Sequence, residues 1–228
     1  MFRHHIAALV FRFLLLLLSV CLYFTDIESL NFTVMPRFNF GGILLIVIMI
    51  TLVVGMLYRI IPNKRIPIGA RKHFDCSYSE VVVKPSDKQI TLAQKQLQKG
   101  AFLSGLGWAL VTATLLCTLW LIDSLSPAAV ILITLFYSVI DLVFILIFCP
   151  FKNLFMKNRC CAVCRIYNWD YFMMCAPLIV FPSLYSTTLF LLSVAVLLRW
   201  EIAIKKHPNF FIAEMNENLG CDRCNSDN

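Results

Sequence analysis

The chain has 228 residues, of which 60% are hydrophobic and 14% charged, and its mean hydropathy is +0.79. A soluble domain has roughly 25% charged and roughly 45–50% apolar residues, so this composition excludes an ordinary soluble fold. The formal net charge of +7 would suggest nucleic acid for a soluble protein. In a membrane protein the distribution of this charge sets the orientation, and we expect lipid rather than nucleic acid as the partner.

The first apolar run covers residues 6–24 and follows a basic start at Arg3. It ends in "SVCLYFTD", which lacks the small-x-small cleavage site of a signal peptide, so we expect a retained signal anchor. The second apolar run covers residues 41–61 and stops at Pro62. Residues 1–58 are therefore predicted to hold the first two spans and an external loop.

A basic loop, 59–100, follows these spans and is predicted to be cytoplasmic. Its stretch "PSDKQITLAQKQLQKG" predicts an amphipathic helix with Ser86 or Asp87 as N-cap and Gly100 as a stop or hinge. Two alternatives stay open for this helix. It lies on the anionic inner leaflet, or it extends the third span into solvent.

The remaining chain is predicted to contain a transmembrane hairpin at 101–148, a Cys-rich cytoplasmic connector at 149–170, a second hairpin at 171–204, and a cytoplasmic tail at 205–228. The first arm of the second hairpin, Tyr171–Pro182, is short for the roughly 20 residues that a crossing helix needs. We therefore expect an all-α, polytopic transmembrane helix bundle with about six spans. The alternative is five spans and a re-entrant segment.

The Lys and Arg residues test this topology. With six spans and an internal N-terminus, 19 of the 20 lie on the cytoplasmic side and only Arg37 lies outside. Topology follows this bias, so both termini are predicted to be cytoplasmic in a multi-pass protein of the plasma membrane. The cytoplasmic segments in this arrangement are 1–12, 59–100, 149–170 and 199–228.

Two CxxC pairs lie in the predicted cytoplasmic segments: Cys161 and Cys164 in the connector, and Cys221 and Cys224 in the tail. Each pair lets two thiolates reach one ion, and two pairs complete a tetrahedral four-cysteine zinc site. The spacing between the pairs far exceeds that of a compact zinc ribbon. However, the intervening hairpin leaves the cytoplasmic face and returns to it. The sequence therefore predicts a zinc site that links connector and tail.

Other assignments of these thiols stay open. Cys160 or His207 is an alternative ligand, since each lies beside the predicted set. Four thiolates are also the usual ligands of an iron–sulfur cluster. Without a metal, the cysteines are reduced thiols, either redox-active or inert.

Asp141 lies inside the fourth apolar run, where a carboxylate costs at least ~2.5–3.5 kcal/mol and usually has a partner. Arg199 in the last run is the partner that we predict. The functional alternative is a proton or ion relay, and the structural alternative is a salt bridge between helices.

No nucleotide-binding or zinc-protease motif is present, so we do not expect an enzyme. The run "FCPFKNLFMKNRCCAVCRIYNWD", followed by "RWE", "KHPNFF" and a terminal CxxC, resembles a group of uncharacterised bacterial multispanning membrane proteins over about the last eighty residues. This resemblance implies a bacterial plasma membrane and carries no activity.

Three functions remain. The first is a non-enzymatic membrane protein whose zinc site forms a docking surface for a cytosolic protein. The second is a transporter or channel component that uses Asp141. The third is a membrane redox protein that uses CxxC thiols or an iron–sulfur cluster.

Overall fold

The computed structural model describes residues 2–34, 39–62, 68–81, 86–156, 164–213 and 215–219. Within these ranges the secondary structure is helical apart from one isolated antiparallel bridge between Glu80 and Asn216. The α-helices are α1 (Phe2–Thr25), α2 (Phe40–Ile60), α3 (Ile68–Arg71), α4 (Asp87–Leu121), α5 (Pro127–Leu146), α6 (Asp170–Cys175) and α7 (Leu184–Lys206). The 3-10 and π segments are η1 (Ile27–Leu30), η2 (Asp75–Ser77), η3 (Phe151–Met156), η5 (Tyr167–Trp169), η6 (Ala176–Val180), η7 (Pro208–Phe211) and η8 (Glu217–Leu219).

Five helices in the described part of the chain (α1, α2, α4, α5 and α7) are long and apolar enough to cross a membrane. They carry large apolar side chains that no other part of the protein covers, such as Phe24 and Leu184, each 81% exposed. Water would penalise so much exposed apolar surface, whereas lipid solvates it. The fold is thus that of a helical integral membrane protein.

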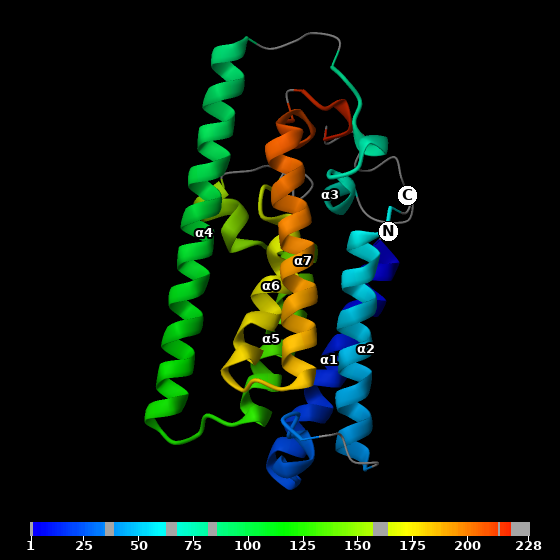
Figure 1. Ribbon diagram of the computed structural model, residues 1–228, viewed down its shortest axis with the longest axis vertical. Helices are drawn as coiled ribbons and strands as arrows, with labels where there is room; N and C mark the ends of the chain where they lie inside the picture. Colours follow the sequence, from blue (N-terminus) through cyan, green and yellow to red (C-terminus); the bar gives the residue numbers. More distant parts are fainter. Residues whose placement is uncertain are drawn as a thin grey trace.

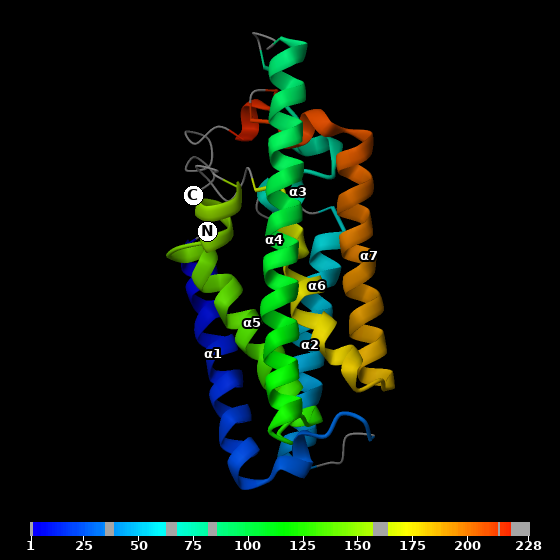
Figure 2. The same ribbon diagram turned by 90° about the vertical axis from the view of Figure 1, so that its left-hand side faces the viewer.

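The long helices lie side by side (Figure 1). Helix α1 packs mainly against α5, and α2 packs against α7, with α6 and η6 between α5 and α7. The core forms where these elements meet, around Leu45, Met56, Ile131, Leu178 and Leu189, each fully buried. Helix α4 stands apart at the periphery, on the left in Figure 1 and nearest the viewer in Figure 2, and contacts mainly η3.

One end of the bundle carries most of the described charged residues. Helices α2, α5 and α7 finish there, and α1 and α4 begin there (Figure 1). We call it the polar end. The connections at the opposite end are short, and three helices begin at polar caps: Asn39 accepts from the Gly42 amide, Ser126 from the Ala129 amide and Ser183 from the Ser186 amide.

Helix α4 contains both the basic amphipathic segment and the third apolar run. It is one continuous helix of 35 residues that passes through Gly100 without a break. Ser86 forms the predicted N-cap, as part of a capping box with Gln89. At 1.5 Å per residue the helix is about 52 Å long, against roughly 30 Å for a hydrocarbon core. Its basic first turns therefore extend the span beyond the apolar layer, and the hinge expected at Gly100 is absent.

The short fifth run is not a full span. It folds as α6 followed by the 3-10 segment η6 and ends before Pro182. Pro177 has no amide hydrogen, which helps to explain why the α-helical pattern stops there. Together the two segments measure about 19 Å, short of roughly 30 Å. The expectation of six full spans is thus wrong for this segment, and five long helices plus a short one describe the fold.

Candidate functional site

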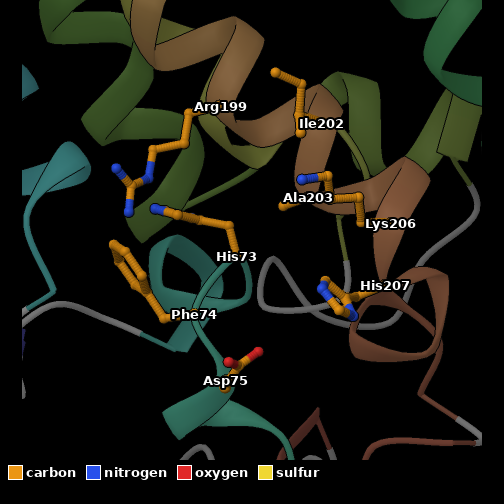
Figure 3. A pocket seen from close by; sticks show the side chains of 8 residues that line it. All are labelled: His73, Phe74, Asp75, Arg199, Ile202, Ala203, Lys206 and His207. Carbon is orange, nitrogen blue, oxygen red and sulfur yellow. The ribbon is translucent and has the colours of Figure 1, made fainter.

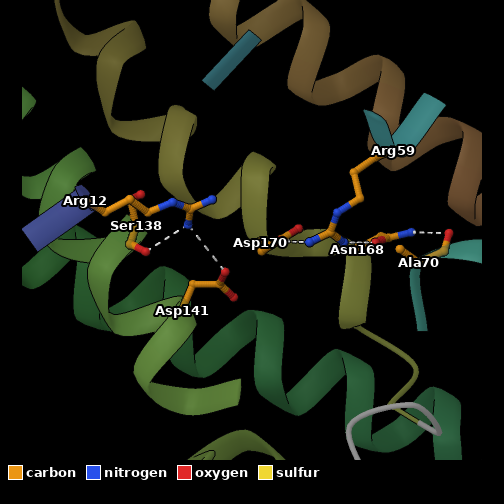
Figure 4. A network of polar contacts seen from close by, with 7 residues as sticks. All are labelled: Arg12, Arg59, Ala70, Ser138, Asp141, Asn168 and Asp170. Carbon is orange, nitrogen blue, oxygen red and sulfur yellow. Dashed lines mark hydrogen bonds and ion pairs between the residues drawn. The ribbon is translucent and has the colours of Figure 1, made fainter. Parts of the chain in front are cut away.

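The polar end has two features that could bind a ligand or take part in chemistry. One is a pocket beside the end of α7 (Figure 3). The other is a set of arginine–carboxylate contacts that joins four helices and the connector (Figure 4). The contacts are described first, because they determine where the connector and its cysteines lie.

Arg59, in the last turn of α2, holds the end of the connector. Its guanidinium donates to the Asp170 carboxylate at 2.7 Å and to the side-chain oxygen of Asn168. The Asn168 amide donates in turn to the Ala70 carbonyl at 3.4 Å. The Arg59 and Asp170 side chains are only 14% and 7% exposed. Arg59 therefore joins α2 to η5 and α6, and Asn168 extends the contact to α3.

Two tyrosines complete the surroundings of this guanidinium. Its carbon lies 5.1 Å from the ring centroid of Tyr167 and 5.4 Å from that of Tyr171, within the range of cation–π attraction. Tyr171 approaches α2 at Gly55, where a Cβ atom would collide with the tyrosine hydroxyl. We call Arg59, Tyr167, Asn168, Asp170 and Tyr171 the Arg59 cluster.

A second ion pair fixes the connector to α7. Arg165 donates two hydrogen bonds to the Glu201 carboxylate, at 2.8 and 2.7 Å. The Trp169 indole donates to the same carboxylate at 2.9 Å, and the Trp200 indole donates to the Arg165 carbonyl at 2.9 Å. Planar, two-point pairing of this kind fixes orientation as well as distance. The described end of the connector is thus held between α2 and α7.

Asp141 has a different partner from the one expected. Its carboxylate lies 3.8 Å from the Arg12 guanidinium of α1, which also donates to the Ser138 carbonyl at 3.0 Å. Arg199 instead stacks over the Phe74 ring at 4.8 Å. The reason is the packing order. Helix α5 lies along α1, whereas Arg199 is an exposed residue of α7 that faces the segment after α3.

The two arginine–carboxylate pairs are close enough to interact. Asp141 experiences the charges of Asp170, Arg12 and Arg59. Two arginines, on α1 and α2, are thus paired with two carboxylates, on α5 and α6 (Figure 4). The opposite charges compensate one another, which lowers the cost of placing them in an apolar bundle.

His73 lies between this network and the pocket. Its Nε2 is 3.0 Å from the Arg59 carbonyl, so Nε2 carries the proton and donates it. Burial, followed by the positive charges of Arg199 and Arg59, lowers the pKa of His73 from 6.5 to about 4, against the opposing effect of that hydrogen bond. The imidazole is therefore neutral at pH 7.

Of the predicted metal ligands, the structure describes only Cys164 and His207. Cys164 is 6% exposed and packs with Ala101 and Ile166. His207 is exposed at the end of α7, and its ring stacks on Phe210 with centroids 4.8 Å apart. Among the described residues no group of three or more His, Cys, Asp or Glu could hold a metal ion. Outside the described residues lie Cys160, Cys161, Cys221 and Cys224.

The sequence analysis did not identify Arg59, Arg165 and Glu201 as interacting residues. One signal was available. Each is a charged residue at the edge of an apolar run, and such residues at neighbouring run ends are of opposite sign. Their pairing could not be deduced, because it depends on which helix ends meet.

Comparison of the chain with protein-family models, with curated proteins and with solved structures finds no match.

Proposed function

We propose that this integral membrane protein is a non-enzymatic scaffold with its polar end in the cytoplasm. In it, Cys161, Cys164, Cys221 and Cys224 bind a zinc ion that links the connector to the C-terminal tail. The linked segments form a docking surface for a cytosolic protein. The observation that carries the proposal is the anchoring of the connector between α2 and α7.

The anchoring supports a metal site because metal ligands need fixed positions. Cys164 precedes Arg165, whose bidentate bond to Glu201 and backbone bond to Trp200 hold the chain. The backbone next to Cys164 is therefore held in place before any ion binds. This reduces the conformational entropy lost when the other ligands close around the ion.

The charge distribution supports the orientation. Arg59, Arg165, Lys205 and Lys206 lie at the polar end, together with the basic first turns of α4. The described connections at the opposite end, 26–34, 122–126 and 181–183, contain no Lys or Arg. Positively charged segments stay in the cytoplasm.

Elemental analysis of detergent-purified protein tests the zinc site. We expect one zinc per chain, lost in both Cys161→Ser and Cys221→Ser and retained in the matched control Cys76→Ser, whose exposed thiol belongs to neither CxxC pair. Unchanged zinc in the first two variants would contradict a shared site. Bound iron together with visible absorbance would indicate an iron–sulfur cluster instead of zinc. A metal-free protein with a reversible CxxC disulfide would indicate redox-active thiols.

Reporter fusions test the orientation. A fluorescent protein fused after Asn228 should fluoresce, and alkaline phosphatase fused after Ser124 should be active, because each reporter works on one side of the membrane only. The reverse pattern would place the polar end outside the cell, where it could not dock a cytosolic protein.

A second function is favoured by one observation, the three charged groups near Asp141, which are Arg12, Asp170 and Arg59. In this reading the carboxylate is part of an ion or proton path. Flux into proteoliposomes should then be abolished by Asp141→Asn and retained in the control Asp123→Asn, which alters a connection outside the bundle. Equal flux in both variants would rule out the carboxylate.

A further inference from the structure

A pocket of about 290 Å³ lies at the polar end, beside the last two turns of α7. Arg199, Lys206 and His207 line it from α7 and its end, and His73, Phe74 and Asp75 line it from the segment after α3 (Figure 3). None of the roles proposed above uses this pocket.

The pocket carries an excess of positive charge. Arg199 and Lys206 are seven residues apart on α7, so both project from the same face of the helix. Among the described residues that line the pocket, Asp75 is the one carboxylate, and His73 is neutral at pH 7. Two cations and one carboxylate leave a net charge of +1, which a monoanion would neutralise.

Arg199 is positioned in advance for such a ligand. Its guanidinium rests on the Phe74 ring at 4.8 Å, which limits its rotamers without using its hydrogen-bond donors. Within the described residues the Arg199 guanidinium makes no hydrogen bond, and a planar guanidinium with free donors suits phosphate oxygens.

An apolar track leads from the membrane into this pocket. Leu184, Leu191, Leu198 and Ile202 are 81%, 60%, 54% and 50% exposed and follow one face of α7 at spacings of seven, seven and four residues. Ile202 also lines the pocket. Helix α7 is one of the five helices able to cross a membrane, so lipid chains cover this face.

We propose that the pocket binds the headgroup phosphate of an anionic phospholipid, whose acyl chains lie along the exposed face of α7. A soluble phosphate would match the cations but would leave the apolar track unused. A zwitterionic lipid would not neutralise the net charge. The proposal requires α7 to be in the membrane and is independent of the thiolate site.

Native mass spectrometry of the full-length protein in detergent tests the selectivity, with phosphatidylglycerol and phosphatidylcholine as probes. Phosphatidylglycerol should bind more tightly than phosphatidylcholine. The double variant Arg199→Gln/Lys206→Gln should weaken its binding about thirtyfold, because two basic residues near an anionic lipid together contribute about one and a half powers of ten to the affinity. The control Lys88→Gln/Lys95→Gln removes the same charge from α4, at the same end, and should leave binding unchanged.

A single variant separates binding from folding. Lys206 is exposed, so Lys206→Gln should preserve the melting temperature and still weaken phosphatidylglycerol binding about fivefold. Equal affinity for the two lipids, or equal losses in the α7 and α4 variants, would overturn the proposal.

Glycerol phosphate, which lacks acyl chains, distinguishes the lipid from a soluble anion. It should compete only weakly with phosphatidylglycerol. The variant Ile202→Ser should weaken the binding of phosphatidylglycerol but not the binding of glycerol phosphate. If glycerol phosphate binds as tightly as the lipid, the ligand is a soluble anion and the lipid proposal is wrong.

Discussion

The Arg59 cluster and the Arg12–Asp141 pair are both arginine–carboxylate contacts between helices, yet they differ in their distances, in the exposure of the carboxylate and in the other neighbours of the arginine. Arg59 lies 2.7 Å from the Asp170 carboxylate, which is 7% exposed. Arg12 lies 3.8 Å from the Asp141 carboxylate, which is 20% exposed. Arg59 also has an amide and two aromatic rings around it, whereas Arg12 donates its hydrogen bond to a backbone carbonyl.

The difference follows from what each contact must hold. Helices α1 and α5 pack along their length, so contacts between them already fix their relative position. The Arg12–Asp141 pair therefore contributes little to that position. The short segments η5 and α6 have too few residues to fix themselves against α2. There the polar contacts set the position.

The largest expected effect comes from breaking the Arg59 cluster. In Arg59→Ala, Asp170 stays buried without its cation. Breaking a buried pair in this way lowers the free energy of unfolding by about 3–5 kcal/mol. We expect a large fall in melting temperature in detergent and faster proteolysis of the connector. A melting temperature equal to that of the unaltered protein would show that α6 is held by packing alone.

The Arg165–Glu201 pair should matter less. Its Glu201 side chain is 27% exposed, and Glu201→Gln keeps one acceptor for the Trp169 indole. Loss of charge-assisted bonding should cost about 1.5–3 kcal/mol. Hydrogen exchange should rise at residues 164–169 and stay unchanged in α1. The control Glu28→Gln alters an exposed carboxylate at the opposite end and should change neither.

A double-mutant cycle should separate the observed partner of Asp141 from the expected one. Arg12→Gln and Asp141→Asn should be coupled by about 0.5–1 kcal/mol, because they share a contact. Arg199→Gln and Asp141→Asn should be additive within about 0.5 kcal/mol. Coupling of Asp141 to Arg199 rather than to Arg12 would contradict the packing of α1 on α5.

The smallest effect at neutral pH concerns His73, whose pKa is about 4 in the folded protein and ordinarily 6.5. Between these values the unfolded chain binds a proton that the folded chain does not. Stability should therefore be complete above pH 6.5 and fall as the pH falls towards 4. Melting temperatures across this window should decline less in His73→Gln. An equal decline in both proteins would assign the effect to carboxylates.

Much of the fold followed from local sequence. The apolar runs predicted α1, α2, α4, α5 and α7, because roughly 20 apolar residues suffice to define a span. Ser86 was recognisable as an N-cap from its own neighbours. The short fifth run was visible too, although its change from α-helix to 3-10 geometry was not.

The site depended on tertiary structure to a greater extent. Asp141 was identifiable as an intramembrane carboxylate from its position in an apolar run, but its pairing with Arg12 needed the neighbours of α5. Similarly, the bonds of Trp169 to Glu201 and of Asp170 to Arg59 needed the ends of α2 and α7.

The sequence by itself determined a helical membrane protein, the positions of its long helices and the strong bias of its basic residues, since hydropathy and charge act along the chain. Only the tertiary structure decided which charges meet, how the connector is held, and that Arg199 lines a pocket with Lys206 instead of pairing with Asp141. Such contacts join residues far apart in the chain, and their partners depend on the order in which the helices pack.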